Sequence, residues 1–386
     1  MSPAVTNMMN EIMEDLAEIE GISFNQHHIV IPTGIDLLDT IAGGGFPAGK
    51  LISIAGSPGG GKSSLAGRII SGFQKFDSRS MAFYVDSEQA MAIDRLVTLG
   101  CDPDRTLLLS QVITLEAVCK IFDKIIQYKI KKKMVDVPFI MVWDSESASP
   151  TEKQLVTDDP SKIMGFKARL LSHILPKIAM DGNKYNITPI LINQLRDKID
   201  MNMYQADMGG LKGMGDKTIT GGNIMKFLPF QLLFVRPKEN IDAEKFGFSG
   251  VVSEVKFVKN KNYIPHIKID LVLDYMKGYS DFWTKQRLLQ NEKAIKGTAW
   301  QSLDNCKDKK FRKKEIEDMY NSDEEFKNCF EEIYEELKKT ATMCPESDEI
   351  RKSDEIVIDE EDDVNVYEKG TLETLTKTNN PDDLLD

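Results

Sequence analysis

Residues 56–63 read Gly-Ser-Pro-Gly-Gly-Gly-Lys-Ser, and this octapeptide constrains the fold more than any other segment of the chain. It fits the pattern G-x-x-x-x-G-K-[ST] at each fixed position. The apolar residues 51–55 before it predict a buried strand, and residues 64–73 after it predict a helix. A glycine-rich loop between a strand and a helix N-terminus gathers backbone N–H groups around a phosphate. The segment therefore predicts a nucleotide-binding P-loop and not an ordinary glycine-rich turn.

Each position of this loop has an expected role. Lys62 is expected to neutralise the β- and γ-phosphates, and the Ser63 hydroxyl to bind Mg²⁺. A second residue that binds the same Mg²⁺ should follow another apolar strand. Asp144, after residues 139–143, fits this role. The alternative is an Asp that merely ends a strand, and we favour the metal role. The predicted ATP-binding residues of the loop are Gly56, Ser57, Pro58, Gly59, Gly60, Gly61, Lys62, Ser63 and Ser64.

Strand and helix patterns alternate through the centre of the chain. Strands are predicted over 80–86, 106–110, 138–144 and 188–194, and helices over 90–99, 115–132 and 164–180. This order predicts an α/β core, a mainly parallel sheet with helices on both faces. Three further strands, 231–235, 251–258 and 264–273, are expected to extend it antiparallel. Two long connections, 145–162 and 195–220, leave the edge where such sheets bind ligands.

Composition divides the 386 residues further. Residues 345–386 contain 15 acidic and 4 basic residues, so this tail holds nearly all of the net charge of −12. Such a tail is expected to be disordered, and the nearly neutral body can still present a basic groove. Residues 307–339 are rich in Glu and Lys and predict helices. We expect an N-terminal segment (1–30), a core (31–274), a small C-terminal helical domain (275–344) and the acidic tail (345–386).

Composition also indicates the cellular compartment in which the protein is expected to work. The five cysteines (Cys101, Cys119, Cys306, Cys329 and Cys344) form no C-x-x-C pair and predict reduced thiols, not a disulfide framework or a zinc site. No apolar run approaches the ~20 residues needed to span a bilayer. The first 20 residues lack a signal pattern. A cytoplasmic protein that does not enter a membrane is expected.

Hydrolysis of a nucleotide needs a carboxylate that polarises the attacking water. Asp86 and Glu88 both follow the strand 80–86, and Glu88 is the better candidate because its side chain is longer. A helix N-terminal acid is the alternative explanation for Glu88. Gln194 ends the strand that enters the long connection 195–220. A Gln there could detect the γ-phosphate and pass its presence to that connection.

Several segments resemble the RecA recombinases. These are Ile192-Asn-Gln-Leu-Arg-Asp-Lys-Ile199, Thr218-Ile-Thr-Gly-Gly-Asn223, Val258-Lys-Asn-Lys261, Ala82-Phe-Tyr-Val-Asp-Ser-Glu88 and Pro32-Thr-Gly-Ile-Asp-Leu-Leu-Asp39. The resemblance covers roughly residues 30–275. The Thr-x-Thr-Gly-Gly-Asn and Lys-Asn-Lys motifs are more specific to this family than the P-loop is. The divergent C-terminal end and the acidic tail look more like the phage UvsX branch.

The resemblance implies a helical filament with ATP between adjacent subunits. Lys259 and Lys261 would then reach the ATP of the neighbouring subunit, whereas alone they would be read as solvated lysines. Arg95 stands where many relatives place an adenine-stacking Tyr, and its guanidinium could stack instead. Single-stranded DNA would lie against part of 145–165 and against 195–220. The implied DNA-binding residues are Arg169, Arg196, Lys198, Lys212, Lys217, Thr220, Gly221, Gly222 and Asn223.

We therefore expect a DNA-dependent ATPase with ATP and Mg²⁺ as cofactors. It would form filaments on single-stranded DNA, pair them with homologous double-stranded DNA and exchange strands. The C-terminal region would either compete with DNA or recruit a loader or single-strand-binding protein. The alternatives are a RecA-fold ring helicase and a mediator that binds ATP without hydrolysing it. Intact Lys62, Ser63, Glu88 and Asp144 argue against the mediator.

Overall fold

The computed structural model describes residues 28–111, 113–156, 165–197, 217–219 and 224–343, together with positions 8 and 12. The predicted acidic tail, 345–386, lies outside these residues, as does nearly all of the predicted segment 1–30. Of residues 195–197 and 217–219 only the backbone is described.

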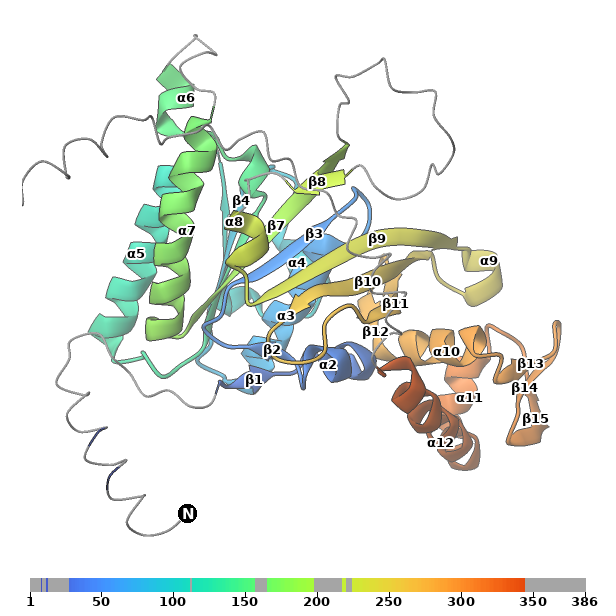
Figure 1. Ribbon diagram of the computed structural model, residues 1–386. Coiled ribbons are helices and arrows are strands. Elements are labelled where there is room, and N and C mark those ends of the chain that lie inside the picture. Colours follow the sequence, from blue (N-terminus) through green and yellow to red (C-terminus); the bar gives the residue numbers. More distant parts are fainter. Residues whose placement is uncertain are drawn as a thin grey trace, which may run out of the picture.

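One large twisted sheet organises the chain (Figure 1). Its strands lie in the order β12-β11-β10-β9-β3-β7-β6-β4-β5. The strands β9, β3, β7, β6, β4 and β5 run parallel. The bounds are β3 (Ile52–Gly56), β4 (Ala82–Asp86), β5 (Thr106–Ser110), β6 (Phe139–Asp144), β7 (Ile187–Asp197), β9 (Gln231–Ile241), β10 (Gly250–Asn260), β11 (Lys268–Asp274) and β12 (Gly278–Ser280). The predicted mainly parallel α/β core is confirmed.

Helices cover both faces of this sheet. On one face lie α5 (Leu115–Lys132) and α7 (Phe166–Tyr185), and on the other lie α2 (Asp36–Ala42), α3 (Lys62–Phe76) and α4 (Ile93–Thr98) (Figure 1). Successive side chains of a strand point to opposite faces. Ile52 and Ile54 accordingly pack in the core beneath α3, whereas Ala55 packs in the core beneath α5 and α7. Strands buried on both faces explain the continuous apolar runs of the sequence.

Short elements complete the core. They are β1 (Val30–Ile31), β2 (Phe46–Pro47), η1 (Pro103–Arg105), η2 (Glu146–Ala148), α6 (Glu152–Val156), β8 (Lys217–Ile219), α8 (Ile224–Phe227) and α9 (Ala243–Phe246). The connections predicted as loops thus contain ordered pieces. Residues 145–162 include η2 and α6, and strand β7 continues to Asp197, where β8 pairs with it antiparallel. Pairing between residues more than twenty positions apart is not visible in local sequence patterns.

One strand prediction and one helix prediction need correction. The strand predicted over 231–235 is parallel to β3, not antiparallel, because the long excursion after β7 returns the chain to the starting edge of the sheet. The antiparallel extension of the large sheet beyond β9 consists of β10, β11 and β12. The helix predicted over 90–99 is shorter and begins at Ile93, after Gln89 with a positive φ of 56°.

The C-terminal unit is not purely helical. It contains α10 (Asp281–Asn291), α11 (Ile316–Ser322) and α12 (Glu324–Ala341), together with a small sheet of β13 (Ile295–Lys296), β14 (Gln301–Leu303) and β15 (Cys306–Phe311). The segment 307–339, predicted to be helical, therefore begins in a strand. Its Lys-rich composition suggested a helix, but Cys306 and Phe311 are buried while Lys307 and Lys310 are exposed, so the segment packs as a surface strand.

Candidate active site

The P-loop connects β3 to α3 as the sequence predicts. A side chain at Gly56 would place its Cβ 1.9 Å from the carbonyl oxygen of Val235 on the neighbouring strand, so the chain requires glycine there. Gly61 has a φ of +90° and precedes the first residue of α3. Lys62 Nζ donates to the carbonyl oxygen of Ser57 at 3.0 Å and closes the loop. A glycine-rich loop that leads into a helix N-terminus is the arrangement that binds phosphate through backbone N–H groups.

The two predicted magnesium positions meet at the mouth of this loop. Ser63 Oγ donates to Asp144 Oδ2 at 2.6 Å, and the Tyr84 hydroxyl donates to the same oxygen at 2.6 Å. Burial raises the pKa of Asp144, and the two hydrogen bonds act in the opposite direction. A hydroxyl and a carboxylate oxygen side by side are hard ligands that suit Mg²⁺, which takes its remaining ligands from phosphates and water. The residues present therefore fit the ion.

Glu88 is exposed at the end of the adjacent strand. Its Oε1 accepts from Ser145 Oγ at 2.5 Å and from Gln194 Nε2 at 2.9 Å. Burial lowers the pKa of Lys62, and the nearby carboxylates of Asp144 and Glu88 act in the opposite direction. The three strand ends thus bring Lys62, Glu88 and Gln194 to one edge. An oriented, solvent-facing carboxylate beside a phosphate cradle can polarise a water molecule.

Asp86, the other candidate base, has a different environment. It is 1 % exposed, and its Oδ2 accepts from the backbone N–H of Met91 at 2.9 Å and from Ser110 Oγ at 3.0 Å. These bonds fasten the loop that follows β4 and leave Glu88 as the accessible carboxylate.

Arg95 lies beside the P-loop helix. Its guanidinium donates to the backbone carbonyl of Tyr275 at 2.5 Å and to Ser64 Oγ at 3.4 Å. The contact brings Tyr275 next to the predicted adenine-stacking position. Sequence reasoning missed this aromatic residue, because its place depends on a contact 180 residues along the chain.

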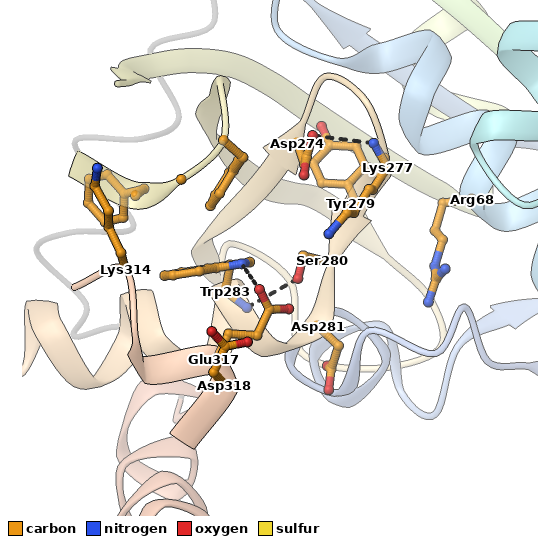
Figure 2. A pocket seen from close by; sticks show the side chains of 14 residues that line it. Arg68, Asp274, Lys277, Tyr279, Ser280, Asp281, Trp283, Lys314, Glu317 and Asp318 are labelled. Carbon is orange, nitrogen blue, oxygen red and sulfur yellow. Dashed lines mark hydrogen bonds between the residues drawn. The ribbon is translucent and has the colours of Figure 1, made fainter. Parts of the chain in front are cut away.

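Tyr279 on β12 was also not predicted. Its buried hydroxyl lies 3.4 Å and 3.3 Å from the carbonyl oxygens of Gly60 and Gly61. On its other side is a cavity of about 410 Å³ between the core and the C-terminal unit, where Trp283 Nε1 donates to Glu317 (Figure 2). None of the P-loop residues, all of which are described, lines this cavity. It is therefore separate from the phosphate cradle.

Lys259 and Lys261 lie at the opposite end of the sheet from the P-loop. Lys259 is level with Leu232, and Leu232 with Ser53, whereas Gly56 is level with Val235. At about 3.3 Å per residue, the backbone of Lys259 is about 10 Å behind Gly56 in the strand direction. In addition, β10 is two strands away from β3. Burial, and then the charge of Lys261, lower the pKa of Lys259. The two lysines cannot reach the P-loop of their own chain.

The structure covers little of the predicted DNA-binding set. Arg169 is exposed on the first turns of α7. Arg196 and Lys217 belong to the paired strands β7 and β8, with side chains outside the described part. The remaining predicted residues, Lys198, Lys212, Thr220, Gly221, Gly222 and Asn223, lie outside the described residues.

Comparisons with known proteins agree with this geometry. Residues 15–280 match the family model described as RecA N-terminal domain. The chain is 30% identical over 334 residues to Protein RecA of Trichodesmium erythraeum, covering 86% of each chain. It is 31% identical over 342 residues to Protein RecA of Mycoplasma mycoides, covering 85% of this chain and 92% of that protein. It is 35% identical over 251 residues to Protein RecA of Ehrlichia ruminantium, covering 65% of this chain and 64% of that protein.

Proposed function

The chain belongs to the RecA family, and we propose that it is an ATP-dependent recombinase that forms a helical filament on single-stranded DNA and exchanges strands with homologous double-stranded DNA. As a RecA-type protein it is a DNA-dependent ATPase. The observation that carries the proposal is the hydrogen bond between Gln194 and Glu88. It joins the candidate water-polarising carboxylate to strand β7, which leads directly into the predicted DNA-binding segment.

In this scheme ATP is the effector and DNA affinity is the output. Backbone N–H groups of the P-loop and Lys62 hold the phosphates, and Glu88 orients the attacking water. Mg²⁺, held by Ser63 and Asp144, would neutralise charge on the phosphates. A γ-phosphate beside Gln194 would change its bond to Glu88 and so bias the strand pair β7–β8. The ATP site and the DNA site would thereby be coupled through Gln194 and the strand pair β7–β8.

The separation between the P-loop and the lysine pair supports a filament. Lys259 and Lys261 lie at the opposite end of the sheet from their own P-loop, and we propose that a second subunit presents its nucleotide to them. A head-to-tail contact between different surfaces that does not close gives a helical filament. Each ATP would then lie between the P-loop of one subunit and the lysine pair of the next.

An apolar groove offers a second filament contact. It has a volume of about 470 Å³ and lies between the edge strand β5 and helix α5. Leu107 is 49% exposed there and Tyr128 41%. We propose that part of residues 1–30 of an adjacent copy occupies this groove and joins consecutive subunits, because an unpaired apolar edge strand needs a covering partner.

Turnover with and without DNA tests the proposed function. ATP hydrolysis by the full chain should rise at least about tenfold on adding single-stranded DNA, since DNA would order the strand pair β7–β8. Electron microscopy with a non-hydrolysable ATP analogue should show helical filaments. Closed rings would identify the helicase alternative, and nucleotide binding without DNA-stimulated turnover would identify the mediator alternative.

The acidic tail and its basic counterpart suggest regulation. Lys307, Lys310, Arg312 and Lys314 are exposed on the C-terminal unit, whose last described residue, Met343, closely precedes the tail. We propose that residues 345–386 compete with DNA for basic surface. Removing them should tighten binding to a fluorescent oligonucleotide by about tenfold at low salt, and by much less at high salt. Equal affinity with and without the tail would leave recruitment of a loader or single-strand-binding protein as its role.

Two finer assignments belong with this proposal. The divergent C-terminal unit and the long acidic tail support a place near the phage UvsX branch, and hence a phage-encoded protein in a prokaryotic cytoplasm. Across the described residues, no helix is long and apolar enough to cross a membrane.

A further inference from the structure

The loop that follows β6, residues 145–149, touches the end of β4 at two points. Ser145 Oγ donates to Glu88 Oε1 at 2.5 Å, and Ser149 Oγ lies 2.7 Å from Ser87 Oγ. Ser149 Oγ also accepts from Trp143 Nε1 at 2.8 Å. The position of this loop therefore helps to orient the Glu88 carboxylate, together with Gln194.

Lys167 of α7 binds the same loop through three hydrogen bonds. Its Nζ, on the first turn of α7, donates to the backbone carbonyl oxygens of Glu146 at 2.9 Å, Ser147 at 3.0 Å and Ser149 at 2.9 Å. An ammonium group has three N–H donors, so Lys167 can make all three of these bonds at once. Charge-assisted bonds of this kind are stronger than neutral ones. A single side chain thus fixes most of the loop against α7.

The side chain of Glu146 completes the contact. Glu146 is 0% exposed, and its Oε1 lies 3.6 Å from Lys167 Nζ. A buried carboxylate requires a nearby cation, and a buried ion pair specifies a position more than it adds stability. The pair therefore sets where α7 and the loop meet.

The first turn of α7 also lies at the end of the connection 145–165, part of which is predicted to bind DNA. Residues 157–164 connect α6 to α7, and Lys153 Nζ of α6 lies 4.9 Å from the centre of the Phe166 ring. The two ends of the segment are therefore held side by side, and Lys167 immediately follows Phe166. A shift of this turn would pull directly on the carbonyl groups of the loop.

We infer that Lys167 is a positioning residue, which holds residues 145–149 where Ser145 can orient Glu88 and so links the first turn of α7 to ATP hydrolysis. The inference rests on the proposed function and deepens it. It adds a route from the first turn of α7 to Glu88 that is separate from the route through Gln194. Lys167 acts through the loop and does not touch the nucleotide.

Replacing Lys167 by methionine in the full chain tests this route. The kcat for ATP with single-stranded DNA should fall at least about tenfold, because a mis-oriented general base loses part of its contribution. The KM for ATP should stay within about twofold, because the contacts of Lys167 given above go to the loop and not to the binding groups Lys62, Ser63 and Asp144. A kcat that matches the unaltered chain would overturn the inference.

Two further variants separate positioning from stability. Lys177→Met removes a lysine of the same helix that pairs with Asp123 at 2.9 Å on the surface, and it should leave turnover unchanged. The double variant Glu146→Gln with Lys167→Met removes both charges of the buried pair. It should remain as slow as Lys167→Met, because the three carbonyl bonds are still missing. Recovery of turnover in the double variant would mean that an uncompensated carboxylate alone caused the loss, and would overturn the inference.

The unaltered chain distinguishes failure of the inference from failure of the proposed function. If its turnover does not respond to single-stranded DNA, both are overturned. If it responds, and Lys167→Met responds equally, only the inference is overturned.

Discussion

Replacing Lys62 by alanine is expected to lower DNA-stimulated ATP turnover by at least about a hundredfold, the loss typical of removing one preorganised group that stabilises transition-state charge. Lys62 is buried at the mouth of the P-loop, with the carboxylates of Asp144 and Glu88 nearby. Without its ammonium group, those two acids would repel the phosphates of an incoming nucleotide. Stable filaments should therefore disappear together with turnover. Steady-state hydrolysis assays and electron microscopy of the same preparations measure the two effects.

Lys75→Ala is the matched control for this variant. Lys75 lies on the same helix, α3, but is exposed in its last turn and far from the phosphate cradle. It should retain both turnover and filaments. DNA-stimulated hydrolysis by Lys62→Ala at the rate of the unaltered chain would contradict the role given to the P-loop.

The part of the site that could be predicted from sequence is the part that depends on local patterns. The P-loop is continuous in sequence, and Asp144, Glu88 and Gln194 each follow an apolar strand. Because the carboxyl ends of parallel strands meet at one edge, these residues had to be neighbours. The same logic gave the parallel order of the core. It did not give the direction of β9, which depends on where a long connection re-enters the sheet.

The unpredicted residues act through contacts between distant segments. Tyr84 bonds to Asp144 across 60 residues, and Tyr279 approaches Gly61 across 218 residues. Lys167 looks like an ordinary exposed lysine of an amphipathic helix until the loop 145–149 is folded against it. The Lys-rich composition of β15 suggested a helix. The burial of Cys306 and Phe311, which fixes this segment as a strand, is not visible in the sequence. Packing, not propensity, decides such segments.

A mixture of two inactive variants should hydrolyse ATP if the site lies between subunits. Glu88→Gln disables the half of the site that belongs to the P-loop subunit. Lys259→Ala with Lys261→Ala disables the half proposed to come from the neighbour. Each variant alone should lose at least about a hundredfold in turnover with single-stranded DNA, as expected when a general base or a cationic finger is removed.

Random co-assembly of equal amounts should then restore roughly a quarter of the unaltered turnover, because that share of head-to-tail contacts joins an intact P-loop half to an intact lysine pair. Energy transfer between labelled copies of the two variants would show that they enter the same filament. Lys259 Nζ also bonds to the backbone carbonyl of Phe227, so its loss could disturb the local fold. Lys261→Ala alone, at an exposed position, repeats the test without that contact.

A second mixture provides the decisive control. Glu88→Ala and Glu88→Gln both damage the half that carries the P-loop and leave Lys62 in place to bind ATP, so their mixed filaments should form but contain no intact site. This mixture should stay inactive, whereas the first recovers. If ATP turnover recovers in both mixtures, the recovery reflects stabilisation of one variant by the other and not a shared site. If turnover recovers in neither mixture although the variants co-assemble, the lysines lie outside the ATP site. The register of β10 favours the shared site, since it puts Lys259 level with Ser53, about 10 Å behind the loop that begins at Gly56. In such an arrangement hydrolysis requires filament assembly, because ATP bound to one subunit also contacts the lysine pair of the next.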